Sequence, residues 1–311
     1  MDRDMIYREE FARDGFFVWR DLLPGDLIDQ HLHEFVSLNE RLEVRPGDDF
    51  HGYTNEKQAL VKRARYDFHR ENEAAQALIF NDDLQAFLQS CFGEEPVMRQ
   101  PETGLYHRRT PDHTDSLDFK ISPLGDEVRV WCALEDIDPD SGPVYFVAGS
   151  HSAISADLER EVLTEHPEFC ALLRSQLQAT TPTEFFTVTR PLWSYVKQQK
   201  LPGAIVEKGL TRDPVPLKKG DAVVFRSDVV HGTCRCANPS LTRKYFVSFW
   251  ATAPAIWYHS RSYWGPLHDY RHPRNAIGAP VERTPHGLRM SFEDLHAAYL
   301  ASFEKPVYQD G

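Results

Sequence analysis

Residues 220–250 read GDAVVFRSDVVHGTCRCANPSLTRKYFVSFW, and this stretch carries two strand-like runs joined by a loop. The runs AVVF and YFVSFW are β-branched or aromatic, which is typical of short strands. The Gly, Asn, Pro and Ser residues between them are typical of turns. The stretch therefore predicts two strands, with His231 at the end of the first and Arg243 near the start of the second.

Strand signals of the same kind dominate the chain from about residue 97 to residue 253. EVRVWCALEDI at residues 127–137 and GPVYFVAG at residues 142–149 are further examples, and a helical insert at about residues 155–178 interrupts them. Short strands separated by turns, and not alternating with helices, indicate a β-sandwich or jelly roll. We therefore predict a mainly β protein with added helices, of the α+β class.

Helical patterns flank this region. In the N-terminal part we expect a helix, a break at Gly15, a short strand FFVW, and then an amphipathic helix with apolar residues at helical spacing. A further helix is expected over NDDLQAFLQSCF, ended by Gly93. The tail, residues 254–311, is rich in aromatic residues. A further helix is expected in it from about Ser291, where the sequence begins like a capping box. Because no linker is visible, residues 1–311 are predicted to form a single domain.

Composition excludes several classes of function. With 35 basic and 47 acidic side chains the net charge is −12, which disfavours nucleic acid or an anionic membrane as a partner. No apolar run approaches the roughly 20 residues of a membrane span, and the polar start lacks the apolar core of a signal peptide. The five cysteines are odd in number and mostly scattered, as expected of reduced thiols. We expect a cytoplasmic monomer or homodimer acting on a small molecule.

The triplet HTD at residues 113–115 carries the first chemical signal. On an extended backbone His113 and Asp115 would point to the same side. Such a pair suits an ion site, an acid–base pair or a surface turn. Together with His231 it provides two imidazoles and one carboxylate, the ligand set of the facial triad that binds Fe(II) and leaves open positions. A jelly roll can bring these distant segments side by side.

Four motifs occur in a characteristic order: EEFARDGFFVWRDLLPGDLI, then HTD, then WCALEDIDPDSGPVYFVAGSH, then the segment at residues 220–250. In these motifs, over about residues 9–253, the chain resembles the phytanoyl-CoA dioxygenase family of Fe(II)/2-oxoglutarate-dependent oxygenases. The resemblance implies a double-stranded β-helix core. It also implies that iron is bound by His113, Asp115 and His231, and that Arg243 binds the far carboxylate of 2-oxoglutarate.

The same resemblance suggests three further cosubstrate contacts. Thr233 stands where the family often has a hydroxyl near that carboxylate. Trp131 stands at the family's tryptophan position, which lines the cosubstrate pocket, and Gln100 is a third candidate for a contact with 2-oxoglutarate. A guanidinium suits the role of Arg243 because it binds a carboxylate through two parallel hydrogen bonds. If Arg243 does not fill this role, Lys244 and Arg235 are the next candidates.

The activity implied is that of a dioxygenase that uses Fe(II), 2-oxoglutarate and O₂. It would hydroxylate an unactivated C–H bond of a small-molecule metabolite or natural-product intermediate, with release of succinate and CO₂. Halogenating relatives have glycine or alanine where this chain has Asp115, so halogenation is not expected. Desaturation or ring formation remains an alternative. A non-oxidative, metal-dependent cupin-type enzyme is another, and it would not need Arg243.

Other histidines compete weakly for the role of ligand. His151 ends the GSH turn, where the family resemblance implies a structural role, and His107 could line the mouth of the site. His259, His268 and His272 lie among aromatic residues of the tail, where packing over the core or shaping of a substrate pocket is the alternative to metal binding.

Overall fold

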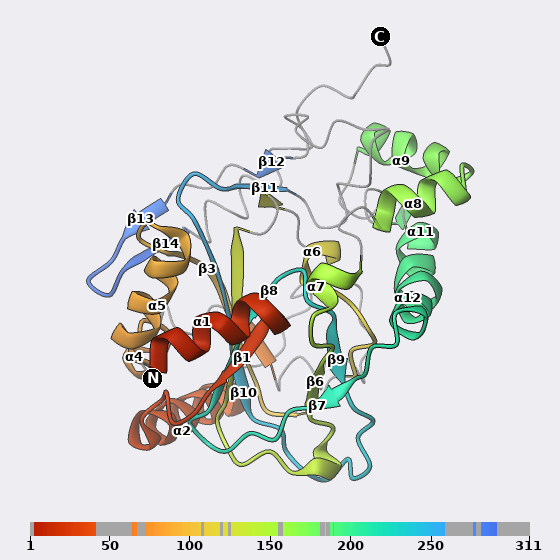
Figure 1. The fold of residues 1–311 in the computed structure, drawn as a ribbon. Helices are drawn as coiled ribbons and strands as arrows, with labels where there is room; N and C mark the ends of the chain where they lie inside the picture. The colour runs from red at the N-terminus through yellow and green to blue at the C-terminus, as the bar shows by residue number, and fades with distance from the viewer. Residues whose placement is uncertain are drawn as a thin grey trace.

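The structure, a computed structural model, describes residues 3–41, 64–66, 72–106, 109–118, 121–123, 126–154, 158–180, 184, 187–188, 190–258, 276–277 and 281–290. Figure 1 shows a central large sheet with the N-terminal helices on one side and the helices of the insert at the opposite side of the molecule. Among the described helices, none combines the length and the apolar character needed to cross a bilayer.

The large sheet has the strand order β1-β8-β5-β10-β3-β14-β13, and β2 also pairs with β3. Its strands are β1 (Phe16–Trp19), β2 (Ala64–Tyr66), β3 (Val97–Gly104), β5 (Glu127–Ala133), β8 (Ala222–Arg226), β10 (Tyr245–Ala251), β13 (Val281–Arg283) and β14 (Leu288–Met290). All pairs are antiparallel except β14 with β3. Of the strands expected within residues 97–253, β3, β5, β8 and β10 form the centre of this sheet, and β1, β2, β13 and β14 add to it from outside that range.

A small sheet, β7-β6-β9, faces the large one, and a third sheet has the order β12-β11-β4. Their strands are β4 (Ile121–Ser122), β6 (Val144–Phe146), β7 (Asp213–Pro214), β9 (His231–Thr233), β11 (Ile256–Tyr258) and β12 (Ala276–Ile277). Val144 and Phe146 of β6 belong to the same apolar cluster as Trp131, Phe225 and Tyr245 of the large sheet. This sheet-on-sheet core is the expected jelly roll.

The other face of the large sheet is covered by helices. Alternate residues of each strand point to opposite faces, so the same strands also provide side chains to this second core. Val130, Val224 and Trp250 share a core with the N-terminal helices. Those helices are α1 (Arg3–Asp14), α2 (Gly25–Arg41), α4 (Glu73–Ile79) and α5 (Asp82–Phe92). The helix α5 has the predicted ends: Asn81 caps its first turn through Leu84 N (3.1 Å), and Gly93 ends it at φ 73°.

The insert is longer than the predicted range of residues 155–178. Its helical segments are α7 (Ser150–Ala153), α8 (Leu158–Glu165), α9 (Phe169–Gln178), α11 (Arg190–Tyr195), the π-helical turn η3 (Val196–Lys200) and α12 (Leu201–Glu207). The later helices were missed because Pro202 and Gly203 suggest a break. Pro202 nevertheless lies at the start of α12, which continues directly from the π-helical turn η3 with helical backbone at Lys200. The helix predicted from Ser291 lies outside the described residues.

Candidate metal and cosubstrate site

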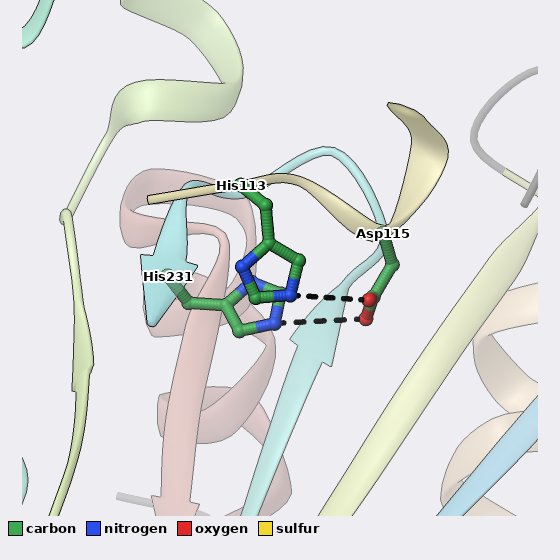
Figure 2. A group of neighbouring side chains, drawn as sticks. All are labelled: His113, Asp115 and His231. Atoms are coloured by element: carbon green, nitrogen blue, oxygen red, sulfur yellow. Dashed lines mark ion pairs between the residues drawn. The ribbon is translucent and has the colours of Figure 1, made fainter. Parts of the chain in front are cut away.

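The side chains of His113, Asp115 and His231 converge, with the two imidazoles facing the carboxylate (Figure 2). His231 begins β9, and its backbone exchanges two hydrogen bonds with His113, at 3.0 and 2.9 Å. The two rings lie with their centroids 4.1 Å apart. The backbone is extended only up to this bridge, because Asp115 begins the single helical turn α6 (Asp115–Asp118). The carboxylate therefore reaches the histidines from a turn and not from a continuous strand.

The donor atoms of the triad face one another. Asp115 Oδ1 lies 3.7 Å from His113 Nε2, and Asp115 Oδ2 lies 3.7 Å from His231 Nε2. These separations are too long for hydrogen bonds. Candidate ligand atoms from all three residues lie within 4.8 Å of one another, so a single ion could contact all of them. Within the described part of the chain, no other group of three or more His, Cys, Asp or Glu side chains has this arrangement.

Backbone carbonyls orient both imidazoles. His113 Nδ1 lies 2.9 Å from Pro111 O, and His231 Nδ1 lies 3.1 Å from Val229 O. A carbonyl only accepts hydrogen bonds, so each Nδ1 carries the proton and donates it. Each Nε2 is then the unprotonated nitrogen, which is the form that binds a metal ion.

Protonation states agree with this assignment. Burial, reinforced by the neighbouring His231, lowers the pKa of His113 to about 3, and burial also lowers the pKa of His231. Burial alone would raise the pKa of Asp115, but Coulombic interactions, of which that with Arg129 is the largest, outweigh it and keep that pKa below its ordinary value. At neutral pH the site therefore presents two neutral imidazoles and one carboxylate, which suit Fe(II).

A buried ion pair behind the triad was not predicted from the sequence. Arg129 Nε lies 3.4 Å from Asp115 Oδ2, and Arg129 Nη2 lies 2.9 Å from Glu127 Oε1. Both side chains are completely buried, and the guanidinium lies 3.7 Å from the ring centroid of Phe249. Burial raises the pKa of Glu127 to about 7, although the charges of Arg129 and Arg99 oppose this. The signal was present: Glu127, Arg129 and Trp131 alternate along β5 and so share its inward face.

Two further ion pairs hold the segment that carries the first two ligands. Asp112 accepts hydrogen bonds from Arg212 Nε at 2.8 Å and from Arg212 Nη2 at 2.6 Å. Asp118, at the end of α6, accepts from Trp193 Nε1 at 2.6 Å and from Lys197 Nζ at 2.8 Å. The helical insert is thereby bonded directly to the turn that begins at the ligand Asp115.

Arg243 is buried near the predicted cosubstrate residues. Its guanidinium lies 6.0 Å from the ring centroid of Trp131 and 5.4 Å from that of Tyr245, and those two rings stack at 5.5 Å. Nη1 donates to Gly142 O at 2.7 Å, whereas the buried Nε has no hydrogen-bond acceptor among the described residues. A buried guanidinium donor of this kind needs an acceptor, and a carboxylate ligand would provide one.

Thr233 and Gln100, the two other residues predicted to contact the cosubstrate, lie on different strands. Thr233 Oγ1 accepts a hydrogen bond from Thr110 N at 2.9 Å, which ties β9 to the segment leading to His113. Gln100 is half-buried on β3 and pairs with Phe249, which in turn pairs with Arg129 on β5, so the three form one row across the sheet. The structure brings Trp131 next to Arg243, whereas Gln100 shares the row of Arg129.

Alternative residues fit less well. Lys244 is paired with Glu135, at 2.8 Å, and Arg235 is exposed, so neither matches the buried environment of Arg243. His151 Nε2 lies 3.2 Å from Ala12 O, a contact with α1 that supports a structural role. His107, His259, His268 and His272 lie outside the described residues.

A sequence model of the phytanoyl-CoA dioxygenase (PhyH) family matches residues 11–244, which include the triad and Arg243. The chain belongs to the phytanoyl-CoA dioxygenase family. A curated relative, phytanoyl-CoA dioxygenase domain-containing protein 1 homolog of Caenorhabditis elegans, is 21% identical, with 72% of this chain and 83% of that protein covered.

Solved structures show the same fold at low identity. The epimerase SnoN from nogalamycin biosynthesis, in complex with Fe3+, alpha ketoglutarate and nogalamycin RO, is 18% identical with a TM-score of 0.56 and covers 92% of this chain and 98% of that one. The alpha ketoglutarate dependent carbocyclase SnoK, also from nogalamycin biosynthesis, is 16% identical with a TM-score of 0.57, covering 93% and 96%. At these identities the likeness establishes the jelly-roll fold.

Proposed function

We propose that this member of the phytanoyl-CoA dioxygenase family is an Fe(II)- and 2-oxoglutarate-dependent oxygenase. It hydroxylates an unactivated C–H bond of a small-molecule metabolite or natural-product intermediate and releases succinate and CO₂. The observation that carries the proposal is the convergence of two neutral imidazoles and one carboxylate in a buried site, in a chain that also buries the guanidinium of Arg243 beside Trp131. A metal site alone would not require that arginine.

Each residue has a distinct task in this proposal. His113, Asp115 and His231 hold the iron, and the backbone acceptors Pro111 O and Val229 O keep the imidazoles in the binding tautomer. Arg243 receives the distal carboxylate of 2-oxoglutarate through the Nε donor that has no acceptor among the described residues. Trp131, stacked on Tyr245, forms the apolar wall beside it.

Iron and 2-oxoglutarate, held by these residues, would supply the difficult chemistry, which is activation of O₂ coupled to oxidative decarboxylation of 2-oxoglutarate. The protein positions the cosubstrate, keeps the ligands in the donor state and excludes water. Burial of all three ligands and of Arg243 supports this division of tasks.

Other outcomes remain compatible with the fold. Similar structures include an epimerase and a carbocyclase, so ring formation or desaturation is a second candidate for the last step. A non-oxidative metal-dependent enzyme is disfavoured, because nothing in such a reaction needs the buried guanidinium of Arg243.

The test is O₂-dependent formation of succinate from 2-oxoglutarate by the Fe(II)-loaded protein, with a metabolite panel added to find a stimulating substrate. We expect the wild type to form succinate and the His231→Ala variant to form none, because loss of one ligand disrupts iron binding. His33→Ala is the matched control, since His33 is exposed on α2, and it should behave like the wild type. Equal succinate formation by wild type and His231→Ala would refute the proposal.

A further inference from the structure

The two histidines do not distinguish between the two oxygens of Asp115. One oxygen lies 3.7 Å from His113 Nε2, and the other lies 3.7 Å from His231 Nε2. From the triad alone, the carboxylate could therefore offer a metal ion either one oxygen or both. The difference matters, because a facial triad leaves three positions open only if the carboxylate occupies one.

Arg129 breaks this symmetry. Its Nε lies 3.4 Å from Oδ2 of Asp115, and the ion pair is inside the protein, where Arg129 is completely buried. This contact is an ion pair and not a hydrogen bond, and the positive charge beside Oδ2 disfavours a metal ion at that oxygen and leaves Oδ1 available.

The position of Arg129 is fixed from three directions. Its backbone lies in β5 between β8 and β10, where it pairs with Phe225 and Phe249. Its guanidinium lies 3.7 Å from the ring centroid of Phe249, and Nη2 lies 2.9 Å from Glu127 Oε1. A buried ion pair is costly in free energy and contributes little net stability, so its presence here invites a specific role.

We propose that Arg129 is a positioning residue that occupies Oδ2 of Asp115, so that the carboxylate gives the metal ion only Oδ1 and one coordination position. Glu127 and Phe249 hold Arg129 in place for this task. The inference rests on the proposed function, because the position kept open is one that 2-oxoglutarate or O₂ would need.

The first test compares the affinity of the Fe(II)-loaded protein for 2-oxoglutarate without O₂, read from the visible absorption band of the chelate. In Arg129→Met the freed oxygen should bind the metal and compete with the cosubstrate, which raises the midpoint roughly tenfold or more. Glu127→Gln combined with Arg129→Met should do the same, and it avoids leaving Glu127 buried without its cation. The absorption of the band is normalised to the bound iron before the midpoint is read, so a loss of folded protein alone does not imitate the effect.

Arg289→Met is the matched control. Arg289 is an arginine of the same large sheet, on β14, and its Nε donates to Glu282 Oε1 at 2.7 Å. Removing it should leave the midpoint close to the wild-type value. An equal shift in Arg129→Met and Arg289→Met would show that loss of any arginine of the sheet has this effect, and no shift in either Arg129 variant would show that Arg129 does not position the ligand; both results overturn the proposal.

A crystal structure of the wild-type protein loaded with nickel, a redox-inert substitute, gives a second readout that needs no variant. We expect Oδ1 of Asp115 on the metal and Oδ2 on Arg129; two bound oxygens would overturn the proposal. A wild-type protein that binds metal but forms no 2-oxoglutarate chelate would refute the proposed function, and the nickel structure would still decide the role of Arg129.

Discussion

At the scale of single residues, Arg243 and Lys244 show how neighbouring cations acquire different tasks. Adjacent strand residues point to opposite faces. Arg243 is buried beside Trp131, whereas the ammonium of Lys244 pairs with Glu135 at 2.8 Å. The buried guanidinium retains an Nε donor with no acceptor among the described residues. This difference supports Arg243, and not Lys244, as the residue for the distal carboxylate.

Arg243→Lys should therefore weaken 2-oxoglutarate binding. A planar, two-donor group is replaced by a point charge that cannot bind both carboxylate oxygens in parallel. The loss should be about 2–4 kcal/mol, or roughly 30- to 1000-fold in affinity. Titration of the Fe(II)–2-oxoglutarate absorption band measures it, with Lys244→Met as the control that should keep the wild-type midpoint. An unchanged midpoint in Arg243→Lys would place the carboxylate site elsewhere.

The sequence predicted the triad and Arg243 but not the pair of Glu127 and Arg129. The residue types of His113, Asp115 and His231 suggested a facial triad, and the resemblance to the family, carried by four motifs in order, singled out these residues and Arg243. Charged residues in a strand are usually at the surface. Burial of Glu127 and Arg129 follows from the position of β5 between β8 and β10, and that non-local pairing cannot be read from local periodicity.

At the scale of elements, close approach of two segments brings His231 to His113. Gly232 follows the ligand in β9, and a Cβ there would overlap Tyr145 Oη and lie 2.9 Å from Thr110 O. The absence of a side chain thus lets β9 lie against both β6 and the segment before His113. On the opposite side of the large sheet, α2 contributes His31, which is buried and lies with Nε2 3.2 Å from Thr103 Oγ1 of β3.

His31 should make the stability of the protein depend on pH. Burial lowers its pKa to about 4, against a hydrogen bond with Asn72 that acts to raise it, while the unfolded chain has the ordinary value of 6.5. Between these values the unfolded state binds the proton and the folded state does not, so acidification favours unfolding. The contribution of His31 should fall by about 2 kcal/mol between pH 7 and pH 5.

Urea unfolding at pH 7 and pH 5 measures this contribution as the difference between the wild type and His31→Gln. The variant should lose less stability on acidification. His33→Gln, an exposed position on the same helix, should retain the wild-type dependence. Identical pH dependence in wild type and His31→Gln would show that His31 takes up a proton equally in the folded and unfolded states.

At the scale of the whole molecule, the site combines parts that are distant in sequence. β9 of the small sheet supplies His231, the segment before α6 supplies His113, the first residue of α6 is Asp115, and β5 of the large sheet supplies Arg129. The insert completes the arrangement through the bonds from Trp193 and Lys197 to Asp118. The jelly-roll class was predictable from short strands and turns. The parallel pairing of β14 with β3 was not, because no local pattern specifies a partner so far along the chain.

The most direct test of the central claim is anaerobic addition of Fe(II) and 2-oxoglutarate to the purified protein, followed by visible absorption. The account predicts a weak charge-transfer band that requires both additions and saturates at one equivalent of each per chain. The band should be absent from His231→Ala and present in His33→Ala. Absence of the band from the wild type, or its full retention in His231→Ala, would contradict the assignment of His113, Asp115 and His231 as the iron site.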